Sequence, residues 1–171
     1  ICSTMNIALI LHDNTMTSKN ALNRPLHADK NDGNLYLLKT IAFTHKNTPI
    51  KELNRFFLHE ENRKERLEYL KFSCDIDEIF YVATCNRIEF FFTTHHILDH
   101  NFLRKFYRHF RNDWNSEEVD FAIKYGEIFE GEDALRHIYR VASSLDSLVI
   151  GEREIITQVR KAYDLCKDDG L

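Results

Sequence analysis

The chain has 171 residues, of which 43% are hydrophobic and 29% are charged, and its formal net charge is −4. These values are typical of one globular domain with a real core, and they exclude a disordered chain. They also exclude a membrane-spanning segment and nucleic-acid binding driven by overall charge, because no long apolar run and no excess of positive charge is present.

The first part of the chain predicts a leader, a strand and two helices. Residues 1–34 are rich in Asn, Asp, Thr, Ser and Lys and show weak hydrophobic periodicity, so we expect a flexible leader. Residues 35–44 form an apolar run that predicts a buried strand. The spacing of apolar residues then predicts a helix over residues 50–57 and a highly charged helix over residues 61–72.

Two further strands and a helix are predicted in the middle of the chain. Residues 78–83 and 88–92 concentrate β-branched and aromatic side chains, as strands do. Residues 97–110 predict a helix, because apolar residues recur at every fourth position. The opposite face of that helix carries arginines that suit either an RNA backbone or, more commonly, a solvated surface. These arginines are Arg104, Arg108 and Arg111.

The last part of the chain predicts a short strand at residues 124–130 and helices over residues 131–145 and 152–167. The resulting order β-α-α-β-β-α-β-α-α predicts an α+β fold, in which a mainly antiparallel sheet packs with helices in a sandwich related to the ferredoxin-like fold. The five glycines form no glycine-rich phosphate-binding motif.

Cys85 lies between the two predicted strands at the centre of the chain, at a junction where functional residues commonly occur. If the backbone stays extended there, Cys85 and Arg87 point to the same face, and the guanidinium favours the reactive thiolate. A lone cysteine between strands is, however, more often a small buried hydrophobic residue. On these residues alone the structural interpretation is the stronger one.

The remaining cysteines and the histidines predict neither disulfides nor a metal site. The four cysteines form no CxxC pair, and no convincing signal peptide precedes them, so we expect reduced thiols in a cytoplasmic protein. The nine histidines do not fall at ligand spacing with the cysteines. His137 lies at the edge of an apolar helical stripe, where an isolated histidine is commonly structural.

Taken together, the segments around Cys85 and His137 resemble the N-terminal catalytic domain of glutamyl-tRNA reductases. That family carries Thr-Cys-Asn-Arg-x-Glu after a strand, which residues 84–89 match. It also carries a motif that begins His-Leu-x-Arg-Val-Ala-Ser and ends in Gly-Glu, which is similar to residues 137–152. A third motif, Asn-His-Lys-x-Ala-Pro, is similar to residues 44–49, and the resemblance extends over about residues 35–170.

The resemblance implies an activity and roles for individual residues. The family reduces the glutamyl group of glutamyl-tRNA to glutamate-1-semialdehyde with NADPH, a step of tetrapyrrole (porphyrin) biosynthesis. Cys85 would attack the ester and form a thioester, and His137 would act as an acid or base or orient the reacting groups. Arg87 would either hold a substrate carboxylate or favour the thiolate. The implied substrate-binding residues are Thr84, Asn86, Arg87, Ser147, Glu152, Arg153, Glu154 and Gln158.

The resemblance also predicts a domain organisation and partners. We expect residues 35–150 to be the catalytic, glutamyl-binding domain and residues 151–171 to be a helix that leads towards an NADPH-binding domain absent from this chain. The chain would then be a fragment that lacks the dimerisation domain as well and is at most an esterase on its own. Expected partners are glutamyl-tRNA, a second copy in a homodimer of the full-length enzyme, and glutamate-1-semialdehyde aminotransferase, with no metal and no membrane.

Three departures from the family pattern leave alternatives open. Ser144 replaces a glycine, Arg153 replaces a proline, and Glu154 replaces a glutamine. They favour a second hypothesis, a non-catalytic RNA- or protein-binding relative, although the cysteine, arginine and histidine of the motifs are intact. A third hypothesis, a cysteine hydrolase unrelated to tRNA, has no local sequence signature around the cysteine.

Overall fold

The computed structural model describes residues 32–143 and 154–171. Its four strands form one sheet in the order β2-β3-β1-β4, and every neighbouring pair is antiparallel. The chain enters these strands in the order β-α-β-β-α-β, which is the connectivity of the ferredoxin-like fold. The expected α+β fold with an antiparallel sheet is therefore confirmed. The strands are β1 (Leu38–Thr44), β2 (Glu78–Ala83), β3 (Arg87–Thr93) and β4 (Glu127–Glu130).

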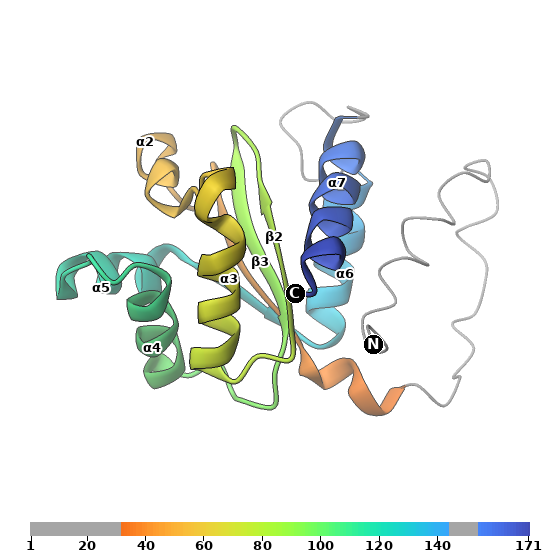
Figure 1. The fold of residues 1–171 in the computed structure, drawn as a ribbon, viewed down its shortest axis with the longest axis horizontal. Coiled ribbons are helices and arrows are strands. Elements are labelled where there is room, and N and C mark those ends of the chain that lie inside the picture. The colour runs from red at the N-terminus through yellow and green to blue at the C-terminus, as the bar shows by residue number, and fades with distance from the viewer. Residues whose placement is uncertain (1–31, 144–153) are drawn as a thin grey trace.

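Helices cover both faces of the sheet (Figure 1). One side carries α2 (Ile50–Leu53), α3 (Glu60–Cys74), α4 (His100–Phe110) and α5 (Ser116–Tyr125), and the other carries α6 (Glu132–Ala142) and α7 (Glu154–Asp169). Two short 3-10 segments, η3 (Asp32–Leu37) and η4 (Asn54–Phe56), precede β1 and follow α2. In the part of the chain that is described, no helix is long and apolar enough to cross a membrane.

Helix α5 and the starts of two strands differ from the sequence-based expectation. The strand expected at residues 124–130 begins at Glu127, because α5 runs to Tyr125. Helix α5 is not predicted, because only Val119 and Ala122 are buried along it and its apolar pattern is short. A capping box, in which Asn115 and Glu118 exchange side-chain and backbone hydrogen bonds, starts this helix. The strand expected from residue 35 begins instead at Leu38, because the preceding residues form the 3-10 segment η3.

The alternation of side chains along β3 sends two different sets of residues to the two faces of the sheet. Phe90 and Phe92 lie against Phe106 of α4. Glu89 and Phe91, on the other face, lie against His137 of α6. The strand that follows Cys85 therefore contributes to a core on one face and to a polar group on the other.

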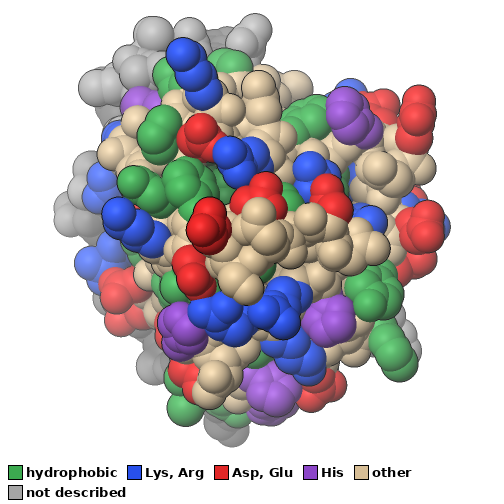
Figure 2. Space-filling view, turned by 90° about the vertical axis from the view of Figure 1, so that its left-hand side faces the viewer, with side chains coloured by type: hydrophobic (Ala, Val, Ile, Leu, Met, Phe, Trp, Pro, Cys, Tyr) green, Lys and Arg blue, Asp and Glu red, His purple; other side chains and the backbone are tan. Residues whose placement is uncertain are grey.

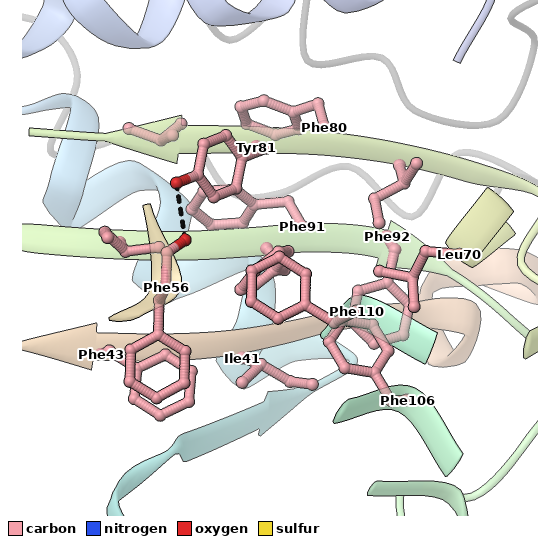
Figure 3. Packing of buried hydrophobic residues seen from close by; sticks show 14 of the residues in the cluster. Ile41, Phe43, Phe56, Leu70, Phe80, Tyr81, Phe91, Phe92, Phe106 and Phe110 are labelled. Atoms are coloured by element: carbon pink, nitrogen blue, oxygen red, sulfur yellow. Dashed lines mark hydrogen bonds between the residues drawn. The ribbon is translucent and has the colours of Figure 1, made fainter. Parts of the chain in front are cut away.

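The face covered by α3, α4 and α5 holds an aromatic core (Figure 3). Phe43 stacks on Phe56 with ring centroids 3.7 Å apart, and Phe110 packs edge-on against Phe90. The Tyr81 hydroxyl donates a hydrogen bond to the Phe56 carbonyl at 2.9 Å. Because burying one such side chain contributes about 1.5–3 kcal/mol, this face supplies much of the stability that holds β1, β2 and β3 in place.

Candidate active site

The loop between β2 and β3 presents Cys85 on a tight hairpin. The backbone N–H of Thr84 donates to the Arg87 carbonyl at 2.9 Å, and the N–H of Asn86 donates to the Thr84 hydroxyl at 3.3 Å. The carbonyl of Asn86 accepts a hydrogen bond from the His45 N–H at 2.9 Å, which ties the loop to the end of β1. Cys85 is exposed at this anchored tip.

The guanidinium of Arg87 points into the sheet rather than along the loop. Since Cys85 and Asn86 form the bend of the hairpin, the extended backbone that would put Cys85 and Arg87 on one face is not present. Nη1 of Arg87 donates to Oε1 of Glu89 at 2.9 Å, and the two residues are 4% and 0% exposed. Arg87 is therefore a buried cation that Glu89 holds in place.

His137 joins this pair from helix α6. Its Nε2 lies 3.1 Å from Oε2 of Glu89, and its ring stacks on Phe129 of β4 with centroids 4.2 Å apart and planes 13° apart. Only 7% of His137 is exposed. Glu89 thus links Arg87 and His137 in one buried group built from β3 and α6.

A cavity of about 400 Å³ opens beside this group, where β1 ends, β4 begins and α6 passes. Four of its residues are lysine or arginine and two are acidic, and Arg87 and Arg136 are themselves paired with Glu89 and Glu132, so the cavity offers groups of both signs to a ligand. Its volume is that of a small-molecule site. The residues that line it are Thr44, Lys46, Arg87, Glu127, Phe129, Asp133, Arg136, His137 and Arg140. Among the described residues Cys85 does not line this cavity, but it lies two residues from Arg87 on the same hairpin.

The structure describes only some of the other residues that the resemblance implies for the site. Thr84 and Asn86 are half-buried in the hairpin with Cys85. Gln158 lies on α7 and is exposed, while Ile155 and Val159 of the same helix are buried. Glu154 is the first residue of α7. Ser147, Glu152 and Arg153, together with the substituted Ser144, lie outside the described residues.

The sequence-based expectation assigns no role to Glu89, which the structure places between Arg87 and His137. It belongs to the motif at residues 84–89, and its position two residues after Arg87 places both side chains on one face of a strand. A carboxylate inside a run of aromatic strand residues is an identifiable signal, because such a group is rarely buried without a partner. Lys46, Arg140 and Phe129 also line the cavity without having been expected there.

The buried cysteines contrast with Cys85. Burial raises the pKa of the Cys74 thiol to about 11, and burial also raises the pKa of the Cys166 thiol. Both are therefore protonated and unreactive near neutral pH. Within residues 32–143 and 154–171, no three His, Cys, Asp or Glu side chains are grouped so that they could hold a metal ion.

Two of the three arginines expected to line one face of α4 are paired with acidic side chains. Arg104 is paired with Asp120 of α5, and Arg111 is paired with Asp113. Figure 2, which views the α2, α4 and α5 side, shows Lys and Arg side chains interspersed with Asp and Glu. This arrangement favours a solvated helix face over a continuous RNA-binding patch.

Comparison with known protein families identifies the family to which these motifs belong. The family model described as "Glutamyl-tRNAGlu reductase, N-terminal domain" matches residues 41–171. The chain belongs to this family. The match begins inside β1 and includes the hairpin, the cavity and helix α7, so the glutamyl-tRNA reductase N-terminal domain contains the whole site described above.

Individual relatives agree with this assignment. The chain is 34% identical over 130 residues to a glutamyl-tRNA reductase of Archaeoglobus fulgidus, covering 76% of this chain and 26% of that protein. It is 34% identical over 133 residues to that of Campylobacter hominis, covering 76% and 30%. The solved glutamyl-tRNA reductase from Methanopyrus kandleri has a TM-score of 0.57 and 26% identity, covering 79% of this chain and 29% of that one. The chain thus spans a quarter to a third of the length of these glutamyl-tRNA reductases.

Proposed function

We propose that this domain acts on the glutamyl ester of glutamyl-tRNA, with Cys85 as the nucleophile. The observation that carries the proposal is the exposed thiol on an anchored hairpin, next to a cavity rich in basic side chains, in a domain of the glutamyl-tRNA reductase family. An ester of glutamate offers a carbonyl carbon to the thiolate and a carboxylate to the basic residues.

In the proposed reaction Sγ of Cys85 bonds to the ester carbon, and the bond to the ribose oxygen of tRNA breaks. The thiol of Cys85 gives up its proton, and the ribose oxygen leaves as an alcohol by taking a proton, which His137 is suited to relay. Arg87, which lines the cavity, would hold a carboxylate of the glutamyl group. Thr84 and Asn86 of the hairpin, and Ser147, Glu152, Arg153, Glu154 and Gln158, remain proposed substrate-binding residues.

Reduction of the thioester needs a hydride donor, and NADPH is the proposed one. The described residues do not fit a dinucleotide: Gly131 follows β4 and precedes α6, but the first turn of α6 carries Glu132 and Asp133, which repel phosphate. We therefore assign no reduction step to these residues. Without NADPH, water would release glutamate from the thioester. The homodimer, the aminotransferase partner and the cytoplasmic location belong to the proposed full-length enzyme.

The test is glutamate release from glutamyl-tRNA without NADPH. We expect release by the unmodified chain and its loss in Cys85→Ala and Cys85→Ser, because an exposed residue can be replaced without unfolding the domain. Cys74→Ala, which removes a buried thiol, is the matched control and should retain release if its circular dichroism is unchanged. Equal release by all variants would refute the nucleophile, and tRNA binding without release by any of them would favour the non-catalytic alternative.

A further inference from the structure

Glu89 occupies an unusual position for a carboxylate. It is 0% exposed, in the middle of β3, and its register partners are Val82 on β2 and Ala42 on β1. A carboxylate in such apolar surroundings is strongly unfavourable unless charged or hydrogen-bonding groups compensate it. Both of its oxygens are compensated, one by Arg87 and the other by His137.

We propose that Glu89 is a positioning residue, which keeps the proton of neutral His137 on Nε2 and so makes Nδ1 the nitrogen that exchanges a proton with the reacting groups. The inference deepens the proposed function and rests on it for the role of His137 in catalysis. The geometry itself does not depend on a substrate.

The hydrogen-bonding capacity of the groups supports this assignment. An ionised carboxylate can only accept hydrogen bonds, and one oxygen of Glu89 already accepts from the Arg87 guanidinium at 2.9 Å. The ring nitrogen 3.1 Å from Oε2 must therefore be the donor, and that nitrogen is Nε2. In a neutral imidazole the other nitrogen is then an acceptor.

The ring of His137 is also held in orientation. Phe129 stacks on one side of it at 4.2 Å, and Phe91 lies with its centroid 6.3 Å away. Turning the ring over about its Cβ–Cγ bond would put a carbon where Nε2 lies and break the hydrogen bond to Glu89. A third group that orients a histidine is the arrangement that acid–base catalysis by histidine commonly uses.

A purely structural ion pair is the competing explanation, and it makes a different prediction. Loss of a purely structural pair lowers the free energy of unfolding but leaves the rate of glutamate release by the folded protein unchanged. Loss of a positioning group changes both the tautomer of the histidine and the reaction rate. The two explanations are therefore separated by the rate, measured beside the tautomer in a folded variant, and not by stability.

The first experiment is a long-range ¹H–¹⁵N NMR spectrum of the chain with ¹⁵N-labelled histidine, above the pH at which His137 is protonated. The His137 ring is identified by its nuclear Overhauser effects to the ring protons of Phe129, which needs no variant. We expect one neutral tautomer with the proton on Nε2. A dominant proton on Nδ1 would overturn the proposal, whatever the variants do.

The second experiment compares Glu89→Gln, which keeps the shape of the side chain, with Glu78→Gln, a matched change on β2. Because an amide can donate to Nε2 as well as accept from it, Glu89→Gln should populate the Nδ1–H tautomer and slow glutamate release at least ~10-fold, within the ~10²–10⁴-fold typical of acid–base catalysis. Glu78→Gln should change neither. An unchanged tautomer or an unchanged rate in folded Glu89→Gln would overturn the proposal.

The NMR and rate measurements test the role of Glu89 separately from the role of Cys85. The tautomer of the unmodified chain is measured without substrate, so it tests the role of Glu89 even if Glu89→Gln does not fold. Equal glutamate release by the unmodified chain and Cys85→Ala would refute the nucleophile while leaving the tautomer result intact.

Discussion

The two faces of the sheet bury the side chains of the same strand by different means. Towards α4, β3 presents Phe90 and Phe92, which meet the aromatic rings of the helix (Figure 3). Towards α6, the same strand presents Arg87 and Glu89, which meet each other and His137. One face is a core held by apolar contact, and the other encloses a charged group beside apolar contacts such as that of Phe80 with Phe91.

The energetics of the two faces differ accordingly. Burial of an aromatic side chain stabilises the fold by about 1.5–3 kcal/mol. A buried ion pair contributes little net stability, because desolvation offsets most of the attraction. The polar group on the α6 face is therefore weakly explained by stability and better explained by the site that it borders. Substitutions confined to one face of the sheet at a time test this difference between the two faces.

The largest expected effect lies in the aromatic core. Phe90→Ala should lower the free energy of unfolding by about 3–5 kcal/mol, because it leaves a cavity between the sheet and α4. Urea unfolding followed by circular dichroism measures the change. Phe72→Ala is the control: Phe72 is 89% exposed, so the change should stay within about 0.5 kcal/mol. Similar losses for both variants would contradict the apolar character of this face.

A smaller effect is expected from the one buried hydroxyl bridge in this core. The Tyr81 hydroxyl donates to the Phe56 carbonyl at 2.9 Å and accepts from the Leu58 N–H at 3.0 Å. Burial raises the pKa of Tyr81, so the group stays a donor over the working pH range. Tyr81→Phe should cost about 1–3 kcal/mol, because it leaves two buried backbone groups unpaired.

The matched control for that change is Tyr69→Phe. Tyr69 is 47% exposed, and its hydroxyl contacts His109 at the surface, where water can replace it. The same thermal or urea unfolding experiment should show a change below about 0.5 kcal/mol. If Tyr81→Phe were equally mild, the link between β2 and the segment after α2 would not matter for stability.

The smallest effect on stability, and a large one on reactivity, is expected at the hairpin. In a Cys2→Ser background, iodoacetamide at pH 8 should label Cys85 alone, since the pKa of Cys74 is raised to about 11 by burial and Cys166 is likewise buried. Mass spectrometry counts the labels, and denaturant should raise the count to three. Rapid labelling of Cys74 in the native chain would show that this part of the core opens readily.

Much of the fold follows from the sequence because hydrophobic periodicity is strong there. The strand predicted at residues 78–83 has the bounds observed for β2, and the adjoining strand and the helix of α4 are found within a few residues. Helix α5 was missed because its signal is a cap and two buried residues. A short amphipathic segment of that kind is stabilised by tertiary contacts more than by its own pattern.

The candidate site is predictable only in part, for a physical reason. The place of Cys85 between two strands is a local property, and the structure confirms it. The contact between Glu89 and His137 joins residues 48 positions apart, so no local pattern contains it. Arg87 illustrates the limit: local alternation placed it beside the cysteine, while the bend of the hairpin directs it to Glu89.

The β2–β3 hairpin is synthesised before β4 and α6, the later parts of the candidate site. The β2–β3 hairpin is a local structure, whereas β4 pairs with β1 across 91 residues and His137 follows later still. Residue 85 is synthesised before residue 137, and the cavity needs non-local pairings that form slowly. The thiol of Cys85 is therefore present before the histidine and the cavity of the proposed site. During synthesis this cysteine is an exposed thiol whose neighbouring site is incomplete until residue 137 has been added.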